Sequence, residues 1–182
     1  MSRARSAVAV RTSVQSLLDA LYGALGVKEI NRESHKEFYD VASFCRSQSE
    51  ELGGQEAQDA WYAFQVGDWA VVGDLGLLLC RQSETLATVS GALGETVVAA
   101  VDSGFEFALF ALYDGGESKR LLVLEDDELV EEGFPISAER GQRRIDFDEE
   151  EAERLWTSYG LPTFEHDPPD DDFIAVAVSL PA

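Results

Sequence analysis

Short polar turns separate a series of apolar runs in the middle of this chain, and they limit the fold more than any other feature does. The turns contain Gly73-Asp74, Asp102-Ser103-Gly104 and Asp114-Gly115-Gly116. Strands joined by turns this short must be antiparallel, because a parallel pair needs a crossover of about a dozen residues or more. We therefore predict an antiparallel β meander.

The runs between these turns are rich in β-branched and aromatic residues, which is typical of strands. The predicted strands cover residues 69–72, 77–80, 96–101, 105–112 and 121–124, and a last strand covers residues 173–180. Residues 83–93 have helical spacing instead. A further helix is predicted after Asp148, because the carboxylates of residues 149–151 favour a first helical turn and Leu155 and Trp156 share an apolar stripe.

Helical periodicity dominates residues 12–66. One helix is predicted from Val14 to Leu25 and ends at Gly26, and a second runs from Ser34 to Leu52 with Ser34 and Glu37 spaced as a capping box. A short third helix would carry Ala57, Ala60, Trp61 and Phe64, although a strand beginning at Trp61 is equally consistent with the pattern.

These assignments predict an α+β fold, with an antiparallel β meander packed against helices and preceded by a helical N-terminal segment. Residues 1–11 are expected to form a flexible tail, because the apolar stretch between Arg5 and Arg11 is short. Residues 12–66 would form the helical segment. Residues 67–182 would form the α+β domain, in one globular unit with the helices.

Negative charge is concentrated towards the C-terminus. The chain has a formal net charge of −21, and residues 121–182 hold 18 acidic and 4 basic residues. Such a field repels nucleic acid and anionic membrane surfaces, and it speeds encounters with cationic protein surfaces. We expect a basic protein partner, no direct nucleic acid and no membrane; solubility alone is the other explanation of the charge.

Two acidic clusters are not explained by a helix start. They are predicted to bind the partner, and they consist of Glu125, Asp126, Asp127, Glu128, Glu131 and Glu132, and of Asp170, Asp171 and Asp172. A solvated loop is the simpler explanation of each cluster. The carboxylate spacing of an EF-hand is absent, so no metal site is predicted.

Catalytic residues are hard to find in this chain. His35 and His166 are the only histidines, and neither is placed beside a candidate nucleophile. Cys45 and Cys80 are predicted to be buried thiols in a reducing cytoplasm. No phosphate-binding, dinucleotide-binding or metalloprotease motif occurs. We therefore predict no cofactor and no catalytic residues, while a carboxylate pair remains a possible hydrolytic site.

Residues Trp69 to Gly116 resemble small bacterial proteins that include the immunity proteins of toxin systems. The similarity consists of a leading Trp69, an apolar hairpin with Gly76, a short helix through Leu86 and Ser90, and paired apolar strands that end at Asp114-Gly115. It covers 48 of the 182 residues and carries over no functional residue. The resemblance implies a binding protein that neutralises a toxin.

The leading hypothesis is a cytoplasmic, non-enzymatic protein that binds a basic protein partner and belongs to the toxin-immunity or defence-associated inhibitors. A DNA mimic that occupies the groove of a nucleic-acid-binding protein is one alternative, and it requires carboxylates spaced along one face. A carboxylate-based hydrolase is the other, and it requires a pocket that holds two acids with raised pKa values.

Overall fold

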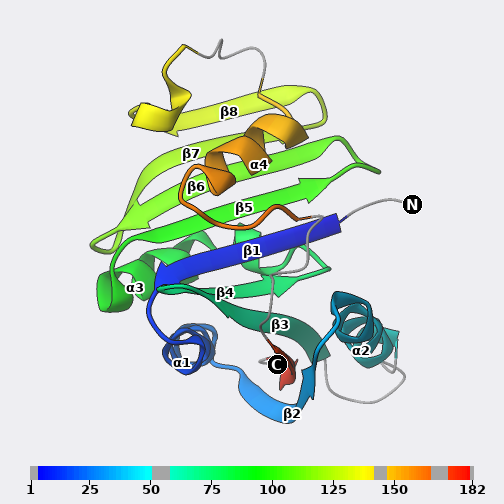
Figure 1. Ribbon diagram of the computed structural model, residues 1–182. Coiled ribbons are helices and arrows are strands. Elements are labelled where there is room, and N and C mark those ends of the chain that lie inside the picture. Colours follow the sequence, from blue (N-terminus) through cyan, green and yellow to red (C-terminus); the bar gives the residue numbers. More distant parts are fainter. Residues whose placement is uncertain (1–3, 51–57, 142–146, 165–171, 181–182) are drawn as a thin grey trace.

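One nine-stranded antiparallel sheet forms the centre of the molecule (Figure 1). The computed structural model describes residues 4–50, 58–141, 147–164 and 172–180. The strands are β1 (Ala4–Arg11), β2 (Lys28–His35), β3 (Gln58–Val66), β4 (Trp69–Asp74), β5 (Thr96–Asp102), β6 (Phe107–Asp114), β7 (Glu117–Glu125), β8 (Glu128–Gly133) and β9 (Phe173–Ser179). Their order in the sheet is β2-β9-β3-β4-β1-β5-β6-β7-β8, so β2 and β8 are the two edge strands.

Helices cover both faces of this sheet. They are α1 (Val14–Leu25), α2 (Phe38–Glu50), α3 (Ser83–Leu93) and α4 (Glu149–Thr157), with 3-10 turns η1 (Leu79–Arg81) and η2 (Ser137–Glu139). The apolar residues of α1 and α3 pack on one face, and those of α2 and α4 pack on the other. Figure 1 shows α4 lying across β5 and β6. The prediction of a mixed α+β fold with an antiparallel sheet is confirmed.

The predicted flexible tail is wrong for its described residues, because Ala4–Arg11 is strand β1 near the middle of the sheet. It pairs with β4 on one side and β5 on the other. Ala7 and Ala9 face the α4 side, while Val8 and Val10 face α1. A strand that is buried on both faces shows no polar alternation, so its short apolar run did not indicate a strand.

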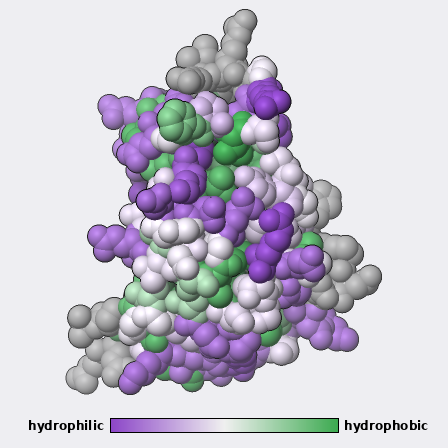
Figure 2. All heavy atoms as spheres, turned by 90° about the vertical axis from the view of Figure 1, so that its left-hand side faces the viewer, coloured by the Kyte–Doolittle hydropathy of each residue, from purple (hydrophilic) through white to green (hydrophobic). Residues whose placement is uncertain are grey.

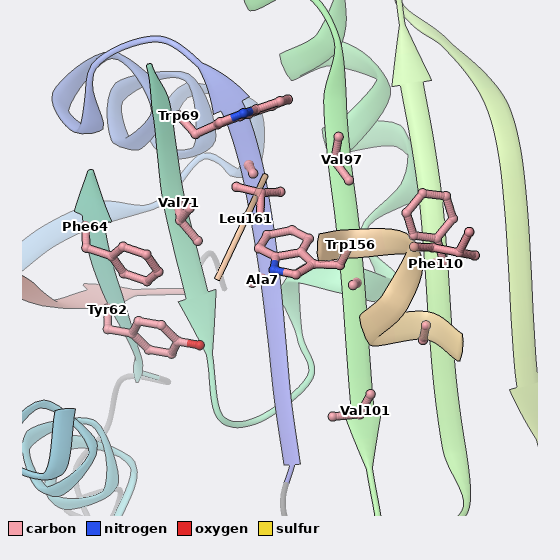
Figure 3. Packing of buried hydrophobic residues seen from close by; sticks show 14 of the residues in the cluster. Ala7, Tyr62, Phe64, Trp69, Val71, Val97, Val101, Phe110, Trp156 and Leu161 are labelled. Carbon is pink, nitrogen blue, oxygen red and sulfur yellow. The ribbon is translucent and has the colours of Figure 1, made fainter. Parts of the chain in front are cut away.

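Figure 3 shows how this strand is covered: Trp156 and Leu161 lie over the part of β1 that carries Ala7. The indole Nε1 of Trp156 donates to the carbonyl oxygen of Pro162 at 2.9 Å, so the buried ring keeps its one hydrogen bond. Trp156 is 1% exposed, which confirms that the stripe of the last predicted helix faces the core.

The helical N-terminal segment over residues 12–66 is not found. Helix α1 is confirmed with its cap at Ser13 and its left-handed end at Gly26. The predicted helix from Ser34 to Leu52 instead begins at Phe38, because the residues before it form the edge strand β2. The segment that contains Trp61 is strand β3, not a third helix, and it pairs with β4 and β9.

The predicted strand over residues 77–80 is also wrong. The side chain of Asp74 accepts hydrogen bonds from the backbone N–H groups of Leu78 at 2.6 Å and Leu79 at 3.4 Å. These bonds turn the chain at the end of β4 into η1, so it cannot continue as a strand. The remaining predicted strands and the helices at residues 83–93 and 149–157 are confirmed.

Candidate interaction surface

The first acidic cluster lies on the β7–β8 hairpin at one edge of the sheet. Glu125 and Glu128 face each other across the turn. Asp126 and Asp127 form the turn with φ values of 52° and 62°. A two-residue turn of this kind requires left-handed backbone at both central positions, and aspartate is among the residues that accept it. Two of the acids therefore also have a local structural reason.

An open hollow lies beside this turn. It has a volume of about 350 Å³ and is lined by Val123, Glu125, Asp126, Glu128 and Val130. The two valines are directly opposite each other in the β7–β8 ladder, and Val130 is 48% exposed. Hydrocarbon and carboxylate groups thus line the same depression, which suits the aliphatic stem and charged end of a lysine or arginine.

Sequence reasoning named the acids of this hollow but missed its valines. Val123 lies two residues before Glu125, and Val130 lies two residues after Glu128. Residues two positions apart share a face of a strand. Once the hairpin is recognised, this two-residue spacing indicates that the valines lie on the same face as the glutamates.

One arginine of the same molecule already contacts the cluster. Arg81 of η1 reaches Glu125 with Nη2–Oε1 and Nη1–Oε2 distances of 2.7 and 3.4 Å, and its guanidinium lies 4.7 Å from the ring centroid of Phe107. The hydrogen bond from Arg81 lowers the pKa of Glu125. Both side chains are about half exposed, so this pair is open to exchange with water or with another cation.

Glu131 and Glu132 point to opposite faces of β8. Glu132 is exposed and lies on the face of Val130, whereas Glu131 accepts a hydrogen bond from Arg120 at 2.8 Å on the α4 face. Glu139 of η2 bonds the same guanidinium at 2.5 and 3.0 Å. Arg120 is only 1% exposed. Glu131 therefore stabilises the fold by binding the buried Arg120, and it is not part of the interaction surface.

The buried guanidinium of Arg120 has partners for its hydrogen-bond donors. Burial acts to lower the pKa of Arg120, but the bonds with Glu139 and Glu131 outweigh it and raise the pKa. The remaining donors bind the carbonyl oxygens of Glu132 and Gly133. This cation, which is charged at any ordinary pH, is therefore held at the end of β8 by partners on β8 and on η2.

Asp172 is the one described residue of the second acidic cluster, and it lies far from the first cluster. Asp172 is exposed and immediately precedes β9, which is seven positions from β8 in the sheet order. At about 4.8 Å per strand the two positions are on the order of 30 Å apart. Asp170 and Asp171 lie outside the described residues, as does His166.

Among the described residues, two acids, Asp74 and Asp59, have raised pKa values. Burial raises the pKa of Asp74 to about 6 and also raises that of Asp59. Asp74 and its hydrogen-bond partner Ser6 are both 0% exposed, so no substrate reaches this carboxylate. Its bonds to residues 78 and 79 give it a structural role.

The two cysteines and His35 are also not arranged as a catalytic or metal-binding site in the described part of the chain. Neither Cys45 nor Cys80 forms a disulfide, both are buried, and burial raises the pKa of each thiol to about 12. His35 ends β2, and its Nε2 lies 3.2 Å from Glu33 without hydrogen-bonding geometry. Among the described residues, no group of three His, Cys, Asp or Glu side chains is placed to hold a metal ion.

An aromatic slot lies on the opposite face of the sheet from α1. Its walls include Phe38, Tyr62, Phe64 and Phe173, and the guanidinium of Arg5 stacks on Phe38 at 4.2 Å. The free volume is about 20 Å³, which is room for roughly one water molecule. The slot is therefore part of the packed core.

Apolar patches are small on the side of the molecule where η2 lies. Figure 2 shows hydrophilic residues over most of this side, with hydrophobic groups scattered between them. Phe134, just after β8, is the most exposed large apolar residue in the described chain at 89%.

Within the described residues, no helix is both long and apolar enough to cross a membrane. Comparison with known proteins gave no significant match to any protein-family model, curated protein or solved structure.

Proposed function

We propose that this chain is a non-enzymatic binding protein whose β7–β8 hairpin docks against a basic surface of a protein partner. The observation that carries this proposal is the hollow that Val123 and Val130 line together with Glu125, Asp126 and Glu128. Glu132, exposed on the same face, extends the acidic surface along β8.

Charge supports association with a cationic partner in two ways. The net charge of −21 attracts a basic protein from a distance, which raises the association rate and makes it depend on salt. At contact, a lysine or arginine stem lies on Val123 and Val130 while its charge reaches the carboxylates. The resemblance of residues 69–116 to immunity proteins suggests a toxin as the partner.

The test begins with capture of host-lysate proteins on the immobilised chain at low and high salt, followed by purification of the most enriched basic protein. Binding of that protein is then measured by stopped flow. The variant Asp126→Asn, Asp127→Asn, Glu128→Gln and Glu132→Gln removes four exposed acids and spares Glu125 and Glu131, which have internal partners. We expect at least a tenfold lower association rate constant.

A matched variant separates the hairpin from the overall charge. Glu37→Gln, Asp40→Asn, Glu84→Gln and Asp114→Asn also remove four exposed acids, but from other parts of the molecule. This variant should retain most of the association rate. Equal losses in both variants, or the absence of any salt-sensitive basic partner, would reject the hairpin as the docking surface. If the captured protein is a toxin, its inhibition should fall with the same variant.

A further inference from the structure

The second edge of the sheet has a different charge pattern from the acidic hairpin. Strand β2 pairs with β9 on one side, and no described strand lies on its other side. Its residues are exposed, except for the partly exposed His35. Figure 1 shows β2 at the margin of the molecule, beyond β9. An edge like this presents backbone N–H and C=O groups to a further strand.

The charges of β2 are complementary to their own reverse order. Lys28 and Glu29 are followed by two uncharged residues and then by Arg32 and Glu33. Because Ile30 is a bulge, Glu29 and Arg32 pair with Val178 and Val176 of β9 and lie on the same face of β2. When a second copy runs antiparallel about a two-fold axis at Asn31, Lys28 therefore faces Glu33 and Glu29 faces Arg32. Opposite charges directly across an antiparallel pair are stabilising.

The neighbouring registers lack this match. Only shifts by two ladder positions keep opposed residues on the same face, and they place Glu29 opposite the second copy's Glu29 or Arg32 opposite the second copy's Arg32. Like charges directly opposite each other are destabilising, so the charge order selects one register. Ile30, which is 48% exposed and forms a bulge in the pairing with β9, then lies next to the axis, where a second copy covers it.

We propose that two copies of this chain pair through β2, antiparallel and about a two-fold axis, so that their sheets join. The net charge of −21 repels a second copy over most of the surface. The charges of Lys28, Glu29, Arg32 and Glu33 cancel, so β2 is a neutral edge. The other edge, β8, carries three glutamates and no basic residue and therefore repels itself. The contact is isologous, as closed dimers require.

The side chains near the axis are already held in place. Arg32 bonds Glu29 at 2.6 and 2.9 Å, and it bonds Gln15 of α1 at 2.9 Å. Tyr22 of α1 donates to Glu29 at 2.7 Å. Side chains fixed before association lose less conformational entropy when a partner binds. Across the axis, the two Glu29–Arg32 pairs would form one network of four charges.

The experiment exchanges charges between copies and measures mass by sedimentation velocity. Wild type should be a dimer. Lys28→Glu alone and Glu33→Lys alone should each lose dimer, because each places like charges opposite each other twice. An equimolar mixture of the two variants should form a dimer again, because every substituted position then faces an opposite charge.

Several results would overturn this proposal. Wild type that remains monomeric at the highest soluble concentration excludes the pairing, and a mixture of the two variants that stays monomeric excludes this register. Lys119→Glu on β7 changes the net charge as Lys28→Glu does, but at an exposed site away from β2. It should leave the dimer intact; loss of the dimer in this control would show a general charge effect instead.

Discussion

The two edges of one sheet solve the same problem with different chemistry. Both β2 and β8 are exposed edge strands that need protection against indiscriminate pairing. The charged residues of strand β8 are all glutamates, so the strand repels copies of itself and attracts cations. Strand β2 alternates charges that cancel, so it accepts a second strand in one register. Two edges of one chain with a net charge of −21 therefore differ in the distribution of charge along them.

The edges also differ in how they are fastened. The end of β8 is held by the buried guanidinium of Arg120, which bonds Glu131 and Glu139. In addition to its backbone hydrogen bonds with β9, strand β2 is held by the more exposed side-chain network of Arg32, Glu29 and Tyr22. A buried charge has lost its hydration, so its stability in the fold depends on its partners. An exposed charge that loses its partner is hydrated by water instead. This difference predicts unequal costs of mutation.

The largest effect is expected at β8. Arg120→Ala leaves the side chains of Glu131 and Glu139 without their buried cation and should destabilise the fold by about 3–5 kcal/mol. Urea unfolding measures the loss. Arg81→Ala is the control, since it breaks the half-exposed ion pair of the same hairpin and should cost about 1 kcal/mol or less. Similar losses for both variants would contradict the assigned role of the buried cluster.

A second effect is expected between the edges, at Asp74. Burial raises its pKa in the folded protein to about 6, from 3.8 for a free aspartate side chain. The folded state therefore binds this proton more tightly than the unfolded state does. Stability from this group is present at low pH and is lost as pH rises through that interval, by up to about 3 kcal/mol. Asp74→Asn removes this dependence.

Denaturant unfolding at several pH values checks the sign. The stability of wild type relative to Asp74→Asn should fall between about pH 4 and pH 6.5 and then level off. The hydrogen bond from Ser6 lowers the pKa of Asp74, so Ser6→Ala should move the same fall to higher pH. A constant difference between wild type and Asp74→Asn across this range would show that the carboxyl is ionised throughout.

The smallest effect is expected at β2. Arg32→Gln removes a partly exposed cation and should cost about 1 kcal/mol or less. The hydrogen bond from Arg32 is the main reason that the pKa of Glu29 is lowered, so this variant should raise that pKa. An NMR titration of the Glu29 carboxyl measures the change. A loss of stability as large as that of Arg120→Ala would mean that the side-chain networks of the two edges contribute equally to the free energy of unfolding.

Patterns of neighbouring residues predicted much of the fold. The spacing of Leu17, Leu18 and Leu21 identified α1, and the acidic start after Asp148 identified α4. The short turns identified antiparallel pairing from β5 to β7, whereas β8 was not among the predicted strands. Each of these signals is complete within a few residues, because helix faces, caps and tight turns depend on local geometry.

The acidic half of the candidate site was equally visible in the sequence, since Glu125 to Glu128 form one continuous run. The separation of Glu131 from that surface was not visible. It depends on Arg120, which reaches Glu131 across the β7–β8 ladder and Glu139 from η2. The sequence pattern alone did not show which acids stay exposed and which are bound to a buried cation.

The sequence by itself determined the helices with clear stripes, the antiparallel pairing of β5 to β7 and the negative charge of residues 125–132. Only the tertiary structure decided that residues 4–11 form a strand between β4 and β5, and that the polar residues 28–35 form an edge beside β9. The physical reason is that local patterns record turns and faces. A strand's place in a sheet depends on backbone hydrogen bonds to residues far away in the chain, and those bonds require no particular side chains.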